Sequence, residues 1–279
     1  MELEHNRQRL AAEGWGICAI SYDPVEVLRD FAQRRGITFP LLADPDSSII
    51  RRFGLLNEEV DPAGRDYGVP YPATFLVDER GIVVQKIMEE HYIHRLPVTT
   101  LLVRLGKTPP LPPPRPARQF AYLEILTAAT ETSLRPGNLV TLYADLQPHP
   151  GVHVYAPGVA GYQGVELTVE PQPYLKVREV HYPTAEALHI PVLGETLAVY
   201  DRPVRIGVDV ALGNRLELQP VYDAGGTLEV RGTLAFQACD DRACYPPQRV
   251  PLVWTFSLLR ADLERPPESL QHRARGERR

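Results

Sequence analysis

Cysteine is scarce in this chain of 279 residues, which contains only three, and long apolar runs and excess basic charge are absent. Three cysteines are too few for a disulfide-rich secreted scaffold, and their number identifies no compartment. No segment approaches the roughly 18 apolar residues of a membrane span, and the first residues lack a signal-peptide pattern. The formal net charge of -5 gives no reason to expect nucleic acid binding. The sequence leaves the compartment open: we expect a cytoplasmic location for the chain as written, and a periplasmic or other extracytoplasmic location if an N-terminal segment is missing.

Proline is abundant, with 28 residues, and its distribution divides the chain. Six of the nine residues at 108–116 are proline, which excludes a helix or a central strand and favours an extended, semi-rigid spacer. A proline-rich ligand for another protein is the alternative, but a spacer between two folded units is simpler. We therefore expect a first domain at 1–107, a linker at 108–116, a second domain at 117–260 and a disordered tail at 261–279.

The first domain alternates helical and strand patterns. Residues 15–22 form a nearly continuous apolar run, typical of a buried parallel strand. An aspartate, a proline and an acidic side chain at 23–26 then give the start signal of a helix, which Gly36 ends. Such alternation indicates an α/β layer fold. Further strands are expected at 38–43, 73–77 and 82–88, and further helices at 2–13, 44–54 and 98–106.

Three runs of this domain resemble the thioredoxin-like peroxiredoxins of the alkyl hydroperoxide reductase/thiol-specific antioxidant type. They are ISYDP at 20–24, FPLLAD at 39–44 and YGVPYPATFLVD at 67–78. The resemblance covers roughly the first 105 residues and implies a thioredoxin-like fold that is incomplete at its N-terminus. In that family the peroxide-reacting cysteine lies at the start of the helix that begins here at Glu2, so no position of this sequence inherits the peroxidatic role.

Several side chains of this domain have competing interpretations. Cys18, inside an apolar run, is expected to be an inert buried thiol, because apolar surroundings suppress thiol reactivity. Pro72 matches the cis-proline of thioredoxin folds, so the resemblance implies a cis bond against the ordinary trans preference. Arg95 corresponds loosely to the family's activating arginine. His91 and His94 share a helical face, but surface histidines are favoured over a metal pair because no third ligand is evident.

Helical signals disappear after the linker, and short strand-like segments separated by turn signals replace them. About eight short strands in roughly 140 residues indicate an all-β sandwich of immunoglobulin-like architecture. The expected strands are 120–128, 139–146, 152–155, 165–169, 175–180, 204–210, 228–236 and 250–258.

Two of the three cysteines, Cys239 and Cys244, stand between the last two expected strands. A four-residue hairpin loop places its flanking residues opposite one another. Opposed Cα atoms of antiparallel strands lie roughly 4.5–5.5 Å apart, inside the roughly 4.4–6.8 Å range of a disulfide. The geometry permits a Cys239–Cys244 bond, and spacing alone supports a static staple and a redox pair about equally.

Two motifs of the second domain resemble the N-terminal domain of the thiol:disulfide interchange protein DsbD. They are HPGVHVYAPG at 149–158 and FQACDDRACYPP at 236–247. The resemblance covers roughly residues 120 to 260 and implies that Cys239 and Cys244 pass electrons between a membrane or thioredoxin-like donor and downstream thiol proteins. The family's cap loop corresponds to the stretch around Val192, which is apolar but lacks the aromatic cap.

The residues next to the cysteines bear on their chemistry. Asp240 and Asp241 favour the neutral thiol, whereas Arg242 favours the thiolate that exchange requires, so the balance stays open. Tyr245 is placed to shield one sulfur, and the two prolines after it keep the strand edge open to a partner. A zinc site is disfavoured because no second cysteine pair or neighbouring histidine completes four ligands. His153 is expected to pack structurally rather than to bind a ligand.

The sequence thus predicts a two-domain thiol–disulfide oxidoreductase that relays electrons through Cys239 and Cys244. Its expected partner is a thioredoxin-like or other thiol–disulfide protein, and no cofactor or metal is implied. Peroxide reduction is expected only where the segment with the family's N-terminal cysteine is present. The rival hypothesis is a non-enzymatic binding module, in which a disulfide-stapled sandwich is carried on a decayed thioredoxin-like scaffold.

Overall fold

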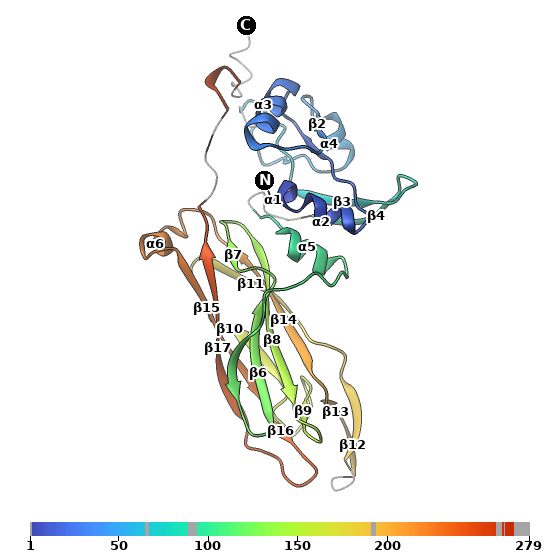
Figure 1. Cartoon of the computed structure of the whole chain (residues 1–279), viewed down its shortest axis with the longest axis vertical. Coiled ribbons are helices and arrows are strands. Elements are labelled where there is room, and N and C mark those ends of the chain that lie inside the picture. The colour runs from blue at the N-terminus through green and yellow to red at the C-terminus, as the bar shows by residue number, and fades with distance from the viewer. Residues whose placement is uncertain are drawn as a thin grey trace. The chain divides into compact units, whose positions relative to one another are not determined.

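A computed structural model describes residues 2–64, 67–88, 94–190, 194–260, 264 and 266–270. The chain divides into two compact units, which Figure 1 shows with the N-terminus in blue and the C-terminus in red. One unit consists of Met1–Val98 with Asp262–Arg279, and the other of Thr99–Ala261. The proline-rich residues 108–116 therefore belong to the second unit.

The described part of the first unit alternates short helices and strands, as predicted for an α/β region. Strand β1 pairs with β2 in parallel, and β3 pairs with β4 in antiparallel, as two separate two-stranded sheets. The elements are α1 (Glu2–His5), α2 (Arg7–Ala12), β1 (Ala19–Ser21), α3 (Val25–Arg35), β2 (Leu41–Ala43), α4 (Ser48–Arg52), β3 (Ala73–Val77) and β4 (Val83–Met88), and the 3₁₀ turn η1 (Glu268–Leu270) also belongs to this unit.

Helix α4 begins four residues later than predicted because Asp44 acts as a cap rather than as part of the helix. Its carboxylate accepts the backbone N–H groups of Ile49 and Ile50, at 3.2 and 2.8 Å. Burial acts to raise the pKa of Asp44, but these hydrogen bonds outweigh it and hold the pKa below its usual value. The ionised side chain thus satisfies N–H groups that the first turn leaves unpaired.

Two predictions for this unit are wrong. Cys18 is exposed and lies just before β1. The strand has only three residues and pairs only with β2 among the described strands, so its neighbour Ile20 is also 41% exposed. The bond before Pro72 is trans, since the described chain contains no cis peptide. The backbone N–H of Tyr71 donates to the carbonyl of Leu55 at 2.7 Å, and this extended segment accommodates the ordinary trans bond.

The prediction that His91 and His94 are surface histidines is wrong for His94 and is not tested for His91. His91 lies outside the described residues, and His94 is buried rather than exposed. The Arg95 guanidinium donates to the carbonyl of His94 at 2.8 Å.

In the predicted tail, Glu264 accepts from Arg34 at 3.1 Å and from Arg35 at 2.7 Å, so this position is held against α3 by ion pairs.

The second unit contains all eight predicted strands, and its helix at Val98–Arg104 agrees with the helix predicted at 98–106. Helix α6 contradicts the expected loss of helices, and the strands β5, β7, β12, β13 and β16 were not predicted. The elements are α5 (Val98–Arg104), β5 (Arg115–Gln119), β6 (Leu123–Ala129), β7 (Ser133–Leu134), β8 (Leu139–Pro148), β9 (His153–Tyr155), β10 (Glu166–Val169), β11 (Leu175–His181), β12 (Glu186–Ile190), β13 (Glu195–Tyr200), β14 (Val204–Leu212), α6 (Gln219–Asp223), β15 (Thr227–Phe236), β16 (Ala238–Cys239) and β17 (Gln248–Leu258).

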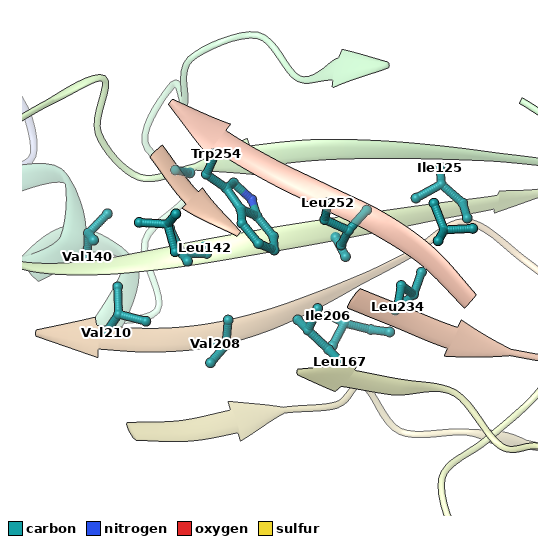
Figure 2. Close-up of a cluster of buried hydrophobic side chains, with 14 of the residues drawn as sticks. Ile125, Val140, Leu142, Leu167, Ile206, Val208, Val210, Leu234, Leu252 and Trp254 are labelled. Carbon is teal, nitrogen blue, oxygen red and sulfur yellow. The ribbon is translucent and has the colours of Figure 1, made fainter. Parts of the chain in front are cut away.

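These strands form three sheets, with the orders β10-β15-β17-β7, β11-β14-β8-β6-β5 and β12-β13-β9-β16. The first two share one hydrophobic cluster, because alternate residues of their strands are buried (Figure 2). Strand β17 alternates buried and exposed residues along nearly its whole length. Its Trp254 is 3% exposed, and the indole N–H donates to the backbone carbonyl of Tyr143 on β8 at 3.0 Å. The core thus joins two sheets and fixes the hairpin that leads to the cysteines.

Gly232 on β15 supports a stability prediction. An added methyl group would meet the Thr168 carbonyl oxygen on the neighbouring β10 and, at 3.0 Å, the Trp254 ring. We expect Gly232→Ala to lower the free energy of unfolding by about 1–3 kcal/mol through overpacking. Urea unfolding followed by Trp254 fluorescence, with Trp15 replaced by Phe, measures the change.

The matched control is Gly16→Ala, where the new methyl group meets no atom within 4 Å. If Gly232→Ala shifts the unfolding midpoint no more than this control does, β15 and β10 have room for the added methyl group and the overpacking argument is wrong.

Candidate functional site

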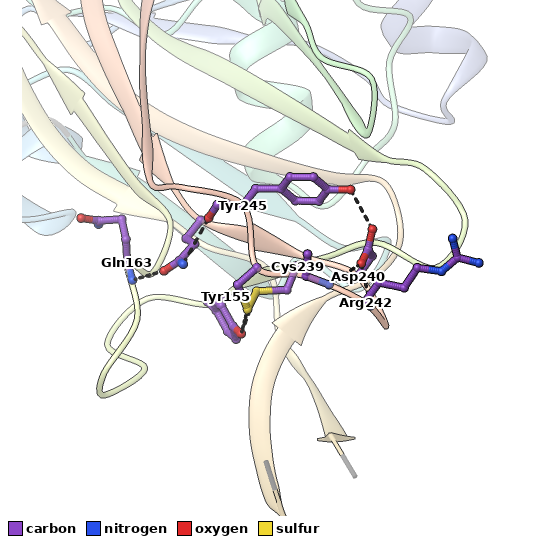
Figure 3. Close-up of a disulfide and its surroundings, with 9 residues drawn as sticks. Tyr155, Gln163, Cys239, Asp240, Arg242 and Tyr245 are labelled. Atoms are coloured by element: carbon purple, nitrogen blue, oxygen red, sulfur yellow. Dashed lines mark hydrogen bonds between the residues drawn. A yellow bond between two sulfur atoms is a disulfide. The ribbon is translucent and has the colours of Figure 1, made fainter. Parts of the chain in front are cut away.

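Cys239 and Cys244 are joined by a disulfide, with their Cα atoms 4.0 Å apart (Figure 3). Strands β15 and β17 form the predicted antiparallel hairpin pair. The cysteines do not lie on those two strands, however, because the chain leaves the first sheet after β15. Strand β16, which carries Cys239, pairs with β9 in the third sheet instead. The bond permitted by the spacing is therefore present, and the two cysteines are directly opposite one another, as predicted for a four-residue loop.

The two bonded cysteines differ in exposure. Cys239 is 2% exposed and lies in a small buried cluster with Tyr155 and Val199. Cys244 is exposed in the loop before β17. A protein thiol that approaches from solvent therefore reaches Cys244 before Cys239.

The phenol of Tyr155 contacts both sulfurs. Its oxygen lies 3.0 Å from Cys239 Sγ and 3.5 Å from Cys244 Sγ. Because disulfide sulfurs carry no hydrogen, the tyrosine hydroxyl is the donor. Burial, with smaller effects of Tyr162 and Glu195, raises the pKa of Tyr155 to about 12. The hydroxyl therefore remains a donor throughout the pH range in which thiols exchange.

The loop between the cysteines is organised by Asp240. One carboxylate oxygen accepts the backbone N–H groups of Arg242 and Ala243, both at 2.8 Å, and the other accepts the Tyr245 hydroxyl at 2.7 Å. The hydrogen bond from Tyr245 and the two from the backbone lower the pKa of Asp240, and its proximity raises the pKa of Tyr245. Asp240 thus holds the loop, while Asp241 is exposed at its tip.

Tyr245 does not occupy the predicted position over a sulfur. Its ring stacks on Tyr122, with centroids 3.8 Å apart and an interplanar angle of 7°. Its backbone carbonyl accepts the side-chain amide of Gln237 at 3.2 Å, and the Gln237 amide oxygen accepts the backbone N–H of Gln163 at 3.2 Å. Figure 3 shows this arrangement, in which Tyr155 rather than Tyr245 contacts the disulfide.

An aliphatic hairpin covers the buried cysteine. Leu188 and Ile190 on β12 and Leu197 on β13 pack against the cluster of Tyr155, Val199 and Cys239. Of the predicted cap stretch at 189–194, Ile190 is thus in contact with this cluster.

Part of this cover was not predicted. The resemblance indicated the stretch around Val192, whereas Leu188 on β12 and Leu197 on β13 were missed. Val192 lies outside the described residues.

His153 is paired with the cysteine strand, which the sequence did not predict. It is directly opposite Cys239 in the β9–β16 pair, and its ring meets that of Tyr155 edge-on with centroids 5.5 Å apart. It is 6% exposed. Its alternation with Tyr155 along β9 was visible in the sequence, but the pairing of β9 with β16 was not.

The described ranges offer neither a metal cluster nor a membrane-spanning helix. They contain no cluster of three or more histidine, cysteine, aspartate or glutamate residues arranged to hold a metal ion. Among the described helices, none has the length and apolar character needed to cross a membrane.

Comparison with known proteins gives two family matches. Residues 1–86 match the AhpC/TSA family, and residues 124–251 match the N-terminal domain of the thiol:disulfide interchange protein DsbD.

Among curated proteins, the chain is 30% identical over 94 residues to a Haemophilus influenzae protein named "Putative peroxiredoxin bcp", covering 32% of this chain and 60% of that protein. It is 38% identical over 71 residues to a Mycobacterium tuberculosis protein also named as a peroxiredoxin, covering 25% of this chain and 45% of that protein. The chain thus spans about half the length of the curated relatives it matches.

One solved structure that resembles the chain is the N-terminal periplasmic domain of ScsB from Proteus mirabilis. The identity is 13% and the TM-score 0.33, over 50% of this chain and 47% of that one.

Proposed function

We propose that this chain, which joins a thioredoxin-like AhpC/TSA region to a strand-rich DsbD N-terminal domain, exchanges thiols and disulfides through Cys239 and Cys244. The observation that carries the proposal is the asymmetry of the disulfide. Cys244 is exposed, whereas Cys239 is buried and accepts a hydrogen bond from Tyr155. Such a bond has one sulfur that a partner reaches and one that is stabilised as it leaves.

The proposed exchange begins when a partner thiolate attacks Cys244 Sγ. The Cys239–Cys244 bond breaks, its electron pair stays on Cys239 Sγ, and a mixed disulfide joins Cys244 to the partner. The partner's second thiolate then attacks its own bonded sulfur and releases Cys244 as a thiolate. The partner ends with a disulfide, and the two protons from its thiols end on Cys239 and Cys244.

Tyr155 supports the first of these steps. Its hydroxyl already donates to Cys239 Sγ at 3.0 Å, and this hydrogen bond strengthens as negative charge develops on the leaving sulfur. A better-stabilised leaving thiolate departs faster. The direction in which electrons flow then depends on the partner, which we propose to be a thioredoxin-like dithiol protein.

The same proposal extends to the rest of the chain. We assign the two sheets with a shared core to an immunoglobulin-like sandwich. Peroxide reduction is proposed only for a chain that includes a peroxide-reacting cysteine before Glu2, because Cys18 lies beyond that position.

The alternative is a static staple in a non-enzymatic binding module. The two cysteines are five positions apart, and the chain-entropy model gives about 2 kcal/mol for a loop this short. A staple is more effective when it closes a long loop. The short loop and the contact of Tyr155 with both sulfurs favour exchange over this alternative.

The test uses the oxidised full chain with Cys18 replaced by Ser. We expect reduced thioredoxin to open the Cys239–Cys244 bond, so that alkylation followed by mass spectrometry labels both residues. Because the staple is short, the melting temperature of the second unit should fall by only about 4–8 °C on reduction.

A bond that thioredoxin leaves intact, but that dithiothreitol opens in denaturant, would instead identify a static staple. The variant Cys239→Ala/Cys244→Ala provides the melting temperature of a chain without the bond.

A further inference from the structure

We propose that His153 accepts the proton of the Cys239 thiol when the reduced pair passes its electrons to a partner disulfide. The inference rests on the proposed exchange at Cys239 and Cys244 and adds to it a base that the exchange requires, since the thiolate is the form that attacks.

The β9–β16 pair places His153 and Cys239 together. Cys239 is directly opposite His153, and Ala238 is opposite Val154. Side chains of directly opposed residues project from the same face of an antiparallel pair. Tyr155, two residues after His153, is on that face as well, and its contact with Cys239 Sγ at 3.0 Å agrees with this placement.

His153 carries a polar atom without a partner. The residue is 6% exposed, and its Nε2 is shielded from solvent and has no hydrogen-bond partner among the described residues. An unpaired buried polar atom costs about 1–3 kcal/mol, so it calls for an explanation.

The redox state supplies that explanation. In the disulfide, Cys239 Sγ has no hydrogen to offer to a neutral imidazole nitrogen. Reduction creates a thiol S–H on the residue directly opposite His153 and frees its sulfur from Cys244. With the imidazole proton on Nδ1, Nε2 is the acceptor for that thiol. The atom that lacks a partner in the oxidised protein thus gains one in the reduced protein.

The surrounding charges suit a base. Burial lowers the pKa of His153, so the imidazole is neutral near pH 7 and able to accept a proton. Asp241, Asp201 and Asp240 act in the opposite direction and stabilise the imidazolium after the proton has arrived. Tyr155 remains protonated and donates. One face of the sheet therefore offers Cys239 a donor and an acceptor.

The step is as follows. Cys244 thiolate attacks the partner disulfide, which leaves a mixed disulfide and one partner thiolate. The Cys239 S–H proton moves to His153 Nε2, and the Cys239 thiolate attacks Cys244 Sγ. The Cys239–Cys244 bond forms, and the second partner sulfur leaves with the electron pair of the mixed disulfide. The partner is reduced, the pair is oxidised, and the imidazolium proton is returned through solvent to the released thiolate.

The test compares His153→Gln with His149→Gln, both in the full chain with Cys18 replaced by Ser. His149 is an exposed histidine in the loop before β9, so its replacement changes composition in the same way without touching the site. Each reduced protein is mixed with oxidised thioredoxin between about pH 5.5 and about pH 8.5, a range that spans the titration of histidine. Quenched-flow mass spectrometry then separates formation of the mixed disulfide from its resolution.

We expect His153→Gln to resolve the mixed disulfide at least about tenfold more slowly near pH 7, a conservative value for the loss of a general base. Its resolution rate should rise with pH towards the wild-type rate as the pH approaches about 8.5, the ordinary pKa of a thiol. Formation of the mixed disulfide should be unchanged, and His149→Gln should match the wild type. A wild-type pH profile of resolution in His153→Gln overturns the inference while leaving the proposed function intact, whereas wild-type protein that forms no mixed disulfide overturns both.

A second measurement applies if His153→Gln fails to fold. In wild-type protein labelled with ¹⁵N-histidine, the Nε2 resonance of His153 should shift on reduction, and that of His149 should not. An unchanged His153 Nε2 resonance on reduction overturns the inference.

Discussion

Cys244→Ser is expected to reduce exchange with a protein partner to the rate of a buffer control, whereas Cys239→Ser is expected to trap the partner as a stable mixed disulfide. The reason is that Cys244 is exposed and Cys239 is 2% exposed. The partner is a thioredoxin whose second cysteine is replaced by Ser and whose remaining cysteine carries a small thiol as a mixed disulfide. Cys244 displaces the small thiol, and the resulting covalent complex cannot be resolved without the buried sulfur, so it accumulates. Non-reducing electrophoresis and intact mass measurement after mixing with this thioredoxin variant detect the complex.

The control for both variants is Cys18→Ser, which removes the other exposed cysteine and should leave exchange unchanged. Equal trapping by Cys239→Ser and Cys244→Ser would contradict the proposed division of roles, because each sulfur would then be accessible to the partner. Full exchange in either variant would exclude the pair as the site.

The strands of the second unit were predictable because their patterns are local. Strand β17 alternates apolar and polar residues from Trp254 to Leu258, and its buried positions there, such as Trp254 and Phe256, are those that the alternation indicates. The short strand β16 has no such pattern, since two residues cannot show a period. Its pairing with β9 joins segments more than eighty positions apart, so packing of the whole unit determines it.

The difference between local patterns and long-range strand pairing also explains which parts of the candidate site were predicted. The cysteine spacing and the loop sequence predicted the disulfide, because both are local features. The contacts of Tyr155 and His153 with the cysteine strand depend on the register between β9 and β16, which no local pattern specifies. The prediction for Cys18 failed for a related reason: an apolar run indicates a buried strand only when other strands or helices cover both of its faces.

Tyr155→Phe is expected to slow the attack of a dithiol partner on the oxidised pair by roughly ten- to a hundredfold. The substitution keeps the ring that stacks on Tyr162, with centroids 4.2 Å apart, and removes only the hydroxyl that donates to Cys239 Sγ. A hydrogen bond to a charged group contributes about 1.5–3 kcal/mol, and each 1.4 kcal/mol corresponds to about a factor of ten in rate. Stopped-flow measurement with excess reduced thioredoxin gives the rate of the first step.

The dependence of this effect on pH distinguishes hydrogen bonding from packing. Because the pKa of Tyr155 is about 12, its hydroxyl donates equally well at every pH at which thioredoxin reacts, so the ratio of wild-type to variant rates should stay constant. Tyr162→Phe, which keeps the stacked ring and the Tyr155 donor and removes only the neighbouring hydroxyl, should retain the wild-type rate within about twofold, because the hydrogen bond of about 1.5–3 kcal/mol from Tyr155 to Cys239 is still present. A Tyr155→Phe variant as fast as Tyr162→Phe would show that the buried sulfur leaves without this donor. In that case the exposure of Cys244 alone would account for the reactivity of the pair.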